Sequence, residues 1–336
     1  MENQIFKSVL APYMDSLLEF KKIRNQKTER YLSTLKSFDN YCLTGGISDI
    51  ADLSVDFIQH WREGMINNKE ITIYAKYQII NQLLCHMRDL GVDCPPIRLP
   101  RSGSDSYIPY IFSLEQIMQI FMEADNLRLA RNDVRWNMYY VPSAIRLLYC
   151  TGIRCGELTA LRNEDVDLVN GTMVLQHTKN GQQRLIPLSE SAVAIMQQFK
   201  TERAKLNIAN SENGDSPFFI NALGKAATVK NIYEWFQRIL RRCGIPHKGR
   251  RYGPRVHDLR HTFAVHTLMR HINSGKAVET AMPWLAAYLG HKRPQSTEHY
   301  VRLASDATPM VYSMQSEIGN KIYENININN EESADW

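Results

Sequence analysis

A segment rich in proline, arginine, glycine and serine interrupts an otherwise helix-forming chain, and this break constrains the fold most strongly. It runs from Pro95 to Ser113 and begins with the letters PPIRLPRSGS, a composition that buries little apolar surface. The 336 residues exceed one typical core, and 44% hydrophobic residues are ordinary for well-packed domains. We therefore predict a domain at residues 1–94, a linker at 95–113, a second domain at 114–324 and a flexible tail at 325–336.

Apolar residues recur at helical spacing through the first ninety positions, starting at Val9. This repeat predicts four helices in the N-terminal domain. The last two are expected at Val55–Glu63 and Ile71–Leu90, and Gly91 is expected to end the second of these.

The period of the apolar pattern changes in the second domain. Three helices are expected first, at Leu114–Ala124, Ser143–Cys150 and Cys155–Leu161. Two strands follow, Thr172–His177 and Arg184–Leu188, and the Lys-Asn-Gly sequence at 179–181 indicates that they form a β-hairpin. Helices return afterwards, so the chain is predicted to be mainly α with a small β-sheet, and its second domain to be α+β.

The overall charge and the cysteines narrow the function classes. A formal net charge of +5 is compatible with a polyanionic partner, although many proteins without such a partner are as basic. The six cysteines form no C-x-x-C pair and have no histidine at zinc-finger spacing, so we predict no metal site and a reduced, cytoplasmic setting. The N-terminus has no signal-peptide pattern, and no segment reaches the roughly 18 apolar residues of a membrane span, so a membrane location is not expected.

Four short motifs carry residues capable of chemistry. They are TGIRCGEL at 151–158, Lys179 in the hairpin turn, HDLRHTF at 257–263, and LGH at 289–291 followed by Tyr300. Each motif also has an ordinary structural interpretation. Arg154 and Glu157, three positions apart, would form an ion pair on one helix face. His257 would be a core residue, Lys179 a solvated turn residue and Tyr300 a packing residue.

The order and spacing of these motifs resemble the tyrosine recombinase family, also called the phage integrase family. Its pattern has arginine in T-G-x-R-x-x-E-L, lysine in a hairpin, then H-x-x-R, L-G-H and a tyrosine, which here follows His291 by nine positions. The resemblance covers about residues 114–313, and the N-terminal helices more loosely resemble the family's SAM-like core-binding domain. It implies a two-domain, C-shaped DNA clamp that acts as a site-specific recombinase in DNA integration and recombination, with double-stranded DNA as its partner.

Phosphoryl transfer without a metal or other cofactor explains why these residue types belong together. The planar guanidinium groups of Arg154 and Arg260 would hold the non-bridging oxygens of the attacked phosphodiester. Tyr300 would be the nucleophile, because nearby positive charge and a proton acceptor favour the phenolate of a group whose ordinary pKa is near 10. The product would be a 3′-phosphotyrosyl bond that a free 5′-hydroxyl reseals.

The same resemblance assigns the remaining site residues. His257 is the expected proton acceptor, and Lys179 is expected to protonate the leaving 5′-oxygen from the minor groove. His291 stands where the family has His or Trp beside the scissile phosphate. Glu157 would hold and balance Arg154 without touching DNA.

Two groups of basic residues are expected to contact the DNA backbone. The first group, near the start of the second N-terminal helix, comprises Lys21, Lys22, Arg24, Lys27 and Arg30. The second group, immediately before His257, comprises Arg241, Arg242, Lys248, Arg250, Arg251 and Arg255. Exposed basic residues are often merely solvated, and this alternative stays open for both groups.

Departures from the family pattern bear on substrate and assembly. Ile272–Pro283 makes the stretch before LGH longer than in compact chromosomal-dimer resolvases and resembles members carried by transposons, which favours an integrase or transposase encoded by a mobile element. Residues 1–20 leave no room for a separate arm-binding domain, so inverted-repeat core sites are the expected substrate.

By resemblance, the apolar residues of 304–322 dock on a neighbouring protomer, which implies a dimer per site and a homo-tetramer on two sites. The protein is expected in the cytoplasm, associated with the nucleoid when it binds DNA.

Three alternatives remain at this point. A type IB topoisomerase would share the chemistry but relax supercoils as a monomer, and the segment after Tyr300 argues against it. A DNA-binding regulator could keep the fold without catalysis, which the presence of all six expected catalytic side chains opposes. An unrelated basic helical protein would require the ordered motifs to be coincidental.

Overall fold

The computed structural model describes residues 5–100, 108–127, 138–176, 183–246, 253–291 and 297–304. Contacts between residues divide the chain into two compact units, Met1–Tyr107 and Ile108–Trp336, each with its own hydrophobic core. The boundary between the units lies inside the Pro95–Ser113 segment. Residues 325–336, predicted to form a tail, lie outside the described residues.

Both ends of the Pro95–Ser113 segment are packed. Ile97 belongs to the core of the N-terminal unit, and Phe112 is fully buried in the core of the C-terminal unit. The backbone N–H of Phe112 also donates to Thr262 Oγ1 at 3.1 Å. The segment therefore buries more apolar surface at its ends than its composition indicates, because a large apolar residue anchors each end to a core.

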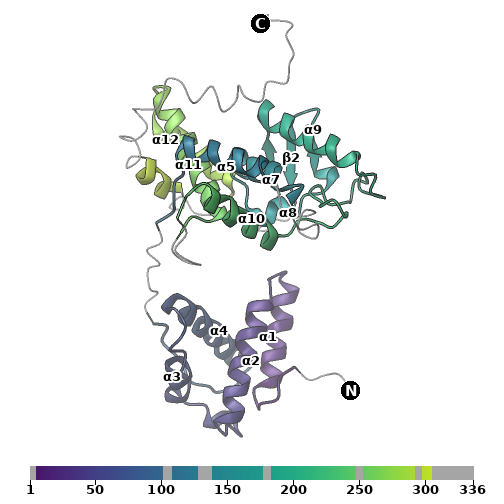
Figure 1. Cartoon of the computed structure of the whole chain (residues 1–336). Helices are drawn as coiled ribbons and strands as arrows, with labels where there is room; N and C mark the ends of the chain where they lie inside the picture. Colours follow the sequence, from purple (N-terminus) through teal and green to yellow (C-terminus); the bar gives the residue numbers. More distant parts are fainter. Residues whose placement is uncertain are drawn as a thin grey trace, which may run out of the picture. The chain divides into compact units, whose positions relative to one another are not determined.

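Four α-helices form the N-terminal unit, drawn in purple to blue in Figure 1. They are α1 (Ala11–Ile23), α2 (Glu29–Thr44), α3 (Val55–Glu63) and α4 (Glu70–Asp89), with a 3₁₀ turn, η1, at Ile50–Asp52. Helix α4 packs against both α1 and α2, and it buries Ile80, Leu83 and Leu84. The ring of Phe38 from α2 meets that of Trp61 from α3 edge to face, with centroids 5.0 Å apart. The four predicted helices are confirmed.

Helix α7 lies at the centre of the C-terminal unit (Figure 1), where it packs against α5, α9, α10 and α11. The helices described in this unit are α5 (Leu114–Asp125), α7 (Val141–Thr151), α8 (Cys155–Thr159), α9 (Glu190–Ala204), α10 (Val229–Arg242), α11 (Val256–Asn273) and α12 (Val278–Leu289). A 3₁₀ turn, η2, covers Asn163–Asp165, and residues 297–304 are also helical. Seven of the eleven residues of α7 are buried and none is exposed, as expected of a helix that is surrounded by others.

A small antiparallel sheet has the strand order β1 (Val166–Asp167), β2 (Thr172–Leu175) and β3 (Arg184–Pro187). The register of β2 and β3 pairs Met173 with Ile186, both fully buried. The mainly α fold with a small sheet is thereby confirmed, and both predicted strands exist, although each ends earlier than predicted. Strand β1 was not predicted, because two residues are too few for an apolar alternation to be visible. Residues 177–182, which connect β2 to β3 and include Lys179, lie outside the described residues.

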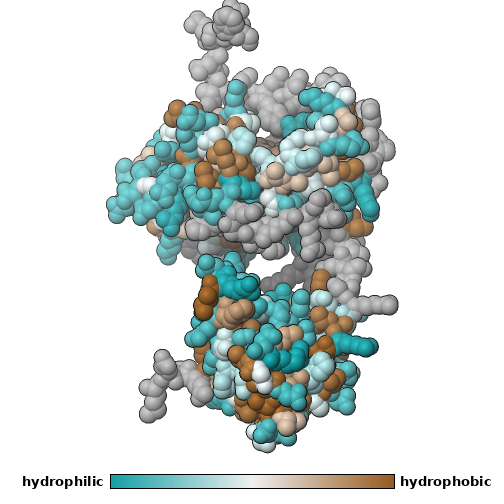
Figure 2. Space-filling view, turned by 180° about the vertical axis from the view of Figure 1, so that it is seen from behind, coloured by the Kyte–Doolittle hydropathy of each residue, from teal (hydrophilic) through white to brown (hydrophobic). Residues whose placement is uncertain are grey.

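Figure 2 shows one face of the surface, where hydrophilic residues predominate and hydrophobic residues form scattered patches. Fully buried side chains such as Phe236 and Leu268 form the interior. Among the residues that the structure describes, no helix combines the length and the apolar character that a membrane span requires.

Gly152 is the glycine on which the central helix depends. It ends α7 in the left-handed conformation, with φ of +59°, and a Cβ there would collide with the ring of Phe263. We expect Gly152→Ala to lower the free energy of unfolding by about 2–4 kcal/mol, the cost of a left-handed alanine together with overpacking. Urea unfolding of the full chain measures this change.

The control for this prediction is Gly156→Ala in α8. A Cβ at Gly156 meets open space, so this variant should unfold at an equal or slightly higher urea concentration. Equal losses of unfolding free energy in the two variants would contradict the proposed role of Gly152 in ending α7.

Candidate active site

The turn between α7 and α8 positions the first motif. Thr151 Oγ1 donates to the Leu147 carbonyl at 2.6 Å, and Gly152 then reverses the chain in the left-handed region. Arg154 is the N-cap of α8, and Glu157 is the third residue of that helix. The spacing T-G-x-R-x-x-E therefore encodes a helix end, a turn and a helix start, with Arg154 and Glu157 facing each other across the new helix terminus.

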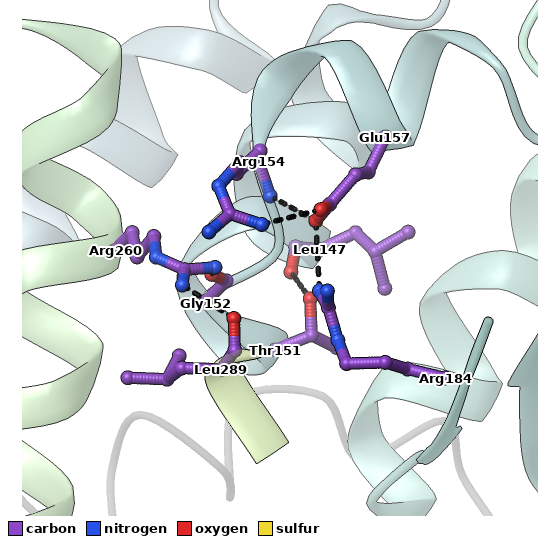
Figure 3. Close-up of polar contacts among 8 residues, drawn as sticks. All are labelled: Leu147, Thr151, Gly152, Arg154, Glu157, Arg184, Arg260 and Leu289. Atoms are coloured by element: carbon purple, nitrogen blue, oxygen red, sulfur yellow. Dashed lines mark hydrogen bonds and ion pairs between the residues drawn. The ribbon is translucent and has the colours of Figure 1, made fainter. Parts of the chain in front are cut away.

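The Glu157 carboxylate lies between two guanidinium groups (Figure 3). Arg154 Nη1 donates to Oε1 at 2.7 Å, and the Arg154 backbone N–H donates to Oε2 at 2.9 Å. Arg184 Nη2, from β3, also donates to Oε2, at 3.0 Å. The Glu157 side chain is only 2% exposed, so both oxygens are satisfied by protein groups.

Opposing effects act on the pKa of Glu157. Burial alone raises it, but hydrogen bonds from the backbone and side chain of Arg154 lower it, as do the charges of Arg184 and Arg154. The outcome is a pKa below the usual value, so Glu157 is ionised at neutral pH. The predicted ion pair with Arg154 is present, and Arg184 is a second partner that the sequence did not reveal.

Helix α11 brings Arg260 to the same turn. The Arg260 side chain is buried, and its Nη1 and Nη2 donate to the carbonyls of Gly152 at 2.9 Å and Leu289 at 2.6 Å (Figure 3). These two bonds use two of the five guanidinium donors, and Arg260 also forms a side-chain hydrogen bond with Tyr300. Burial first, and the charge of Arg154 second, lower the pKa of Arg260 to about 10, which leaves it protonated at neutral pH.

Tyr300 lies beside Arg260, although it comes from the helical segment 297–304. Its side chain is buried, and its Oη lies 3.0 Å from His261 Nδ1. Burial raises the pKa of Tyr300, whereas the charge and hydrogen bond of Arg260 and the charge of Arg154 act in the opposite direction. The phenol is therefore held protonated by burial next to the charges that favour its ionisation.

His291 follows the end of α12, which Gly290 terminates with φ of +66°. Its Nδ1 lies 2.8 Å from Thr297 Oγ1, and its ring stacks on Tyr300 with centroids 5.9 Å apart. Burial, followed by the charges of Arg260 and Arg154, lowers the pKa of His291 to about 4. The imidazole is neutral at physiological pH and can offer one donor and one acceptor.

The structure thus brings together predicted residues from four separate parts of the sequence. Arg154, Arg260 and Tyr300 act on one another electrostatically, and His257 and His291 belong to the same cluster. The His257 ring meets that of His261 edge to face at 4.8 Å. The roles assigned to these residues remain predictions, and Lys179 lies outside the described residues.

Sequence reasoning missed two residues of the cluster, Arg184 and His261. Arg184 precedes Ile186 by two positions, so strand alternation places both on the inward face of β3, and this was a usable signal. His261 lies four residues after His257 on α11 and so shares its face. Burial, followed by the charges of His257, Arg260, His299 and Arg255, lowers the pKa of His261 to about 3 and keeps it neutral beside Tyr300.

The first group of predicted DNA-contacting residues surrounds the loop between α1 and α2. Lys22, Arg24, Lys27 and Arg30 are exposed. Lys21 is different, because its Nζ donates to Gln82 Oε1 at 2.8 Å and lies 5.1 Å from the centroid of the Tyr31 ring. Lys21 therefore has a structural role inside the N-terminal unit.

The second predicted group is only partly described. Arg241 and Arg242 are exposed at the end of α10, and Arg242 Nη1 donates to the Asn126 carbonyl at 3.2 Å. Arg255 is the N-cap of α11, and its backbone N–H donates to Asp258 Oδ2 at 2.7 Å. The other members, Lys248, Arg250 and Arg251, lie outside the described residues. Within the described ranges, no group of three or more His, Cys, Asp or Glu side chains is placed to hold a metal ion.

Comparisons with known proteins identify the class to which this fold and site belong. A model of the phage integrase family matches residues 112–306. The putative integrase/recombinase y4rB of Sinorhizobium fredii is 32% identical over 235 residues, which cover 69% of this chain and 71% of that protein. Tyrosine recombinase XerC of Staphylococcus aureus (strain MSSA476) is 25% identical over 325 residues, which cover 93% of this chain and 91% of that protein.

Two solved structures share the fold. XerH site-specific recombinase bound to palindromic difH substrate, in a post-cleavage complex, has a TM-score of 0.62 at 18% identity, with 94% of this chain and 91% of that chain covered. The Tn1549 transposon integrase in complex with transposon right end DNA has a TM-score of 0.64 at 15% identity, with 88% and 94% covered.

The chain therefore belongs to the phage integrase family. It is a tyrosine recombinase, an enzyme of the class that cleaves and joins DNA strands, and the resemblance predicted from the sequence is confirmed. The comparisons do not favour the type IB topoisomerase alternative.

The histidines of the C-terminal unit predict how its stability depends on pH. The pKa is lowered to about 3 for His261 and to about 4 for His266 and His291, in each case mainly by burial. Between about pH 4 and 6.5 the unfolded chain binds these protons and the folded chain does not, so stability is complete above pH 6.5 and falls as the pH decreases. Each histidine contributes at most about 1.4 kcal/mol per pH unit.

His266→Gln isolates one of these contributions, because His266 lies outside the cluster and contacts the Tyr149 hydroxyl at 3.0 Å. The unfolding free energy of this variant, measured between pH 4 and 7, should depend less steeply on pH than that of the unsubstituted protein. Identical slopes would show that His266 is protonated in the folded state as readily as in the unfolded state.

Proposed function

We propose that this protein is a site-specific recombinase in which Tyr300 attacks a DNA phosphodiester and forms a 3′-phosphotyrosyl intermediate. The observation that carries the proposal is the position of the Tyr300 phenol among Arg260, Arg154 and His291, whose side chains come from separate elements. An ordinary packing tyrosine has no need of two arginines whose charges favour its ionisation.

The arginines stabilise the charge that develops on the phosphate. Arg154 and Arg260 donate hydrogen bonds to its non-bridging oxygens, and their positions are fixed in advance by Glu157 and by the carbonyls of Gly152 and Leu289. His291 donates a further hydrogen bond to the phosphate. Fixed donors need no reorganisation when the charge forms, and this preorganisation is the source of the rate enhancement in such sites.

Two protons move during cleavage. The Tyr300 Oη–H bond breaks, and its proton passes to His257, while Lys179 protonates the 5′-oxygen as its bond to phosphorus breaks. Resealing reverses these steps, since the phosphotyrosyl bond retains the free energy of the phosphodiester. The neutral imidazole of His261 lies 3.0 Å from Tyr300 Oη and keeps Oη in place before cleavage.

The proposed substrate, assembly and location are those that the family resemblance implies. Both units would contact double-stranded DNA at an inverted-repeat core site, with one dimer on each site and a homo-tetramer joining two sites. Among its structural neighbours, a lambda integrase tetramer is bound to a Holliday junction. The long Ile272–Pro283 stretch supports an integrase or transposase encoded by a mobile element, acting in the cytoplasm. DNA contact by the two basic groups belongs to the same proposal.

Trapping of the covalent intermediate tests the proposal without knowledge of the target site. Nicked fragments of the source replicon are incubated with the protein and denatured in SDS, and the DNA that stays attached is sequenced. We expect one recurring sequence, joined to Tyr300 as mapped by mass spectrometry, and no adduct with Tyr300→Phe.

The negative outcomes have distinct meanings. Tight DNA binding without any adduct would indicate a regulator that lacks catalysis. An adduct that persists in Tyr300→Phe would assign the nucleophile to another residue.

The salt dependence of DNA binding tests the basic group of the N-terminal unit. Arg30→Ala should reduce the slope of log K against log salt concentration by about 0.9, the value for one lost phosphate contact. Lys36→Ala, an exposed change farther along α2, serves as the control and should leave the slope unchanged. Equal slopes for all three proteins would remove Arg30 from the DNA interface.

A further inference from the structure

Arg184 enters the active site from β3, and none of the proposed catalytic steps uses its side chain. Its side chain is 10% exposed, and it reaches Glu157 across 27 positions of sequence. Its Nε is buried and has no hydrogen-bond partner within the described ranges. Burying a charged side chain costs free energy unless other groups compensate its charge, so the buried position of Arg184 needs an explanation.

We propose that Arg184 is a positioning residue for phosphoryl transfer. It holds Glu157 so that the Arg154 guanidinium points at the scissile phosphate and the site keeps a net positive charge there. This inference rests on the proposed function, because it takes Arg154 as a phosphate ligand.

Arg184 constrains the geometry of the contact between Glu157 and Arg154. Arg184 occupies Glu157 Oε2 together with the Arg154 backbone N–H, which leaves Oε1 for a single Arg154 Nη. A carboxylate with two free oxygens tends to bind one guanidinium through both of its nitrogens. By occupying Oε2, Arg184 prevents that bidentate arrangement and leaves more of the Arg154 donors available for phosphate oxygens.

Arg184 also changes the net charge beside Arg154. An isolated Arg154–Glu157 pair is neutral and would attract a phosphate weakly. Two guanidinium groups and one carboxylate leave a net charge of +1 on the triad formed by Arg154, Glu157 and Arg184. In a buried site this difference in net charge strongly affects the attraction for a phosphate, because little water screens it.

The end of α12 leaves space for the Arg184 side chain. A Cβ on Gly290 would collide with the Arg184 guanidinium, so this glycine makes room for Arg184 as well as adopting the left-handed conformation. The charge of Arg184 also contributes to lowering the pKa of His291, the next residue. Arg184 therefore lies between the Arg154 turn and the His291 turn, two of the segments proposed to hold the phosphate.

The test compares two substrates in single-turnover cleavage by the full chain, at the core site recovered by covalent trapping. One substrate has an ordinary scissile phosphodiester, and the other has a methylphosphonate there, in which a neutral methyl group replaces one non-bridging oxygen. Arg184→Gln should slow adduct formation on the phosphodiester by about 10–100-fold, as do other losses of a group that supports a ligand-holding residue. On the methylphosphonate, which carries no negative charge, the loss should shrink to a few-fold.

Two further variants keep the result interpretable. Arg184→Lys retains the charge without the planar fork, so it should cleave the phosphodiester faster than Arg184→Gln. Arg146→Gln breaks an ion pair with Asp125 outside the site, at 2.6 Å, and should leave the ratio of the two rates unchanged even if it lowers stability.

Three outcomes would overturn the proposal: an unchanged rate for Arg184→Gln on the phosphodiester, an equal loss on both substrates, or an equal loss in Arg184→Gln and Arg184→Lys. Failure of the proposed function is recognised separately, because the unsubstituted protein would then form no adduct at Tyr300.

Discussion

One buried carboxylate organises the arginine side of this active site. Glu157 accepts three hydrogen bonds, from the backbone and side chain of Arg154 and from Arg184, and these contacts compensate the cost of burying its charge. The same contacts start α8 and connect β3 to the α7–α8 turn. Because the Gly152 carbonyl in that turn also accepts from Arg260, the placement of both phosphate-directed arginines depends on a few residues of backbone.

Charge and burial act in opposite directions on Tyr300. Burial raises the pKa of its phenol, and Arg260 and Arg154 act against burial. A bound phosphate would engage the arginines, and the proton would leave by way of the neighbouring histidines. The apolar cluster that includes Leu268 and Leu285 fixes the backbone on which these groups stand. The packed core therefore determines the distances within the cluster, and the proposed function assigns the charge stabilisation to the arginines.

Local sequence patterns predicted most of the helices and the motif residues, because helix periodicity and turn residues act over only a few positions. The T-G-x-R-x-x-E motif is local in this sense, and its ion pair was predicted correctly. The contact of Arg184 with Glu157 and that of His261 with Tyr300 span 27 and 39 positions, so no local pattern reveals them. Strand β1 is too short to show an alternation, and the anchoring of Ile97 and Phe112 depends on which core each one reaches. The sequence therefore does not predict which distant side chains contact each other, although the alternation in β3 indicates that Arg184 faces inward.

The most direct test of the central claim, that Arg154 and Arg260 are held in advance to grip one phosphate, is a crystal structure of Tyr300→Phe bound to its nicked core site. The account predicts that both guanidinium groups donate to non-bridging oxygens of the scissile phosphate, at about 2.7–2.9 Å. It also predicts that Glu157 remains between Arg154 and Arg184. A scissile phosphate bound by other residues, or a Glu157 that has left both arginines, would contradict the account.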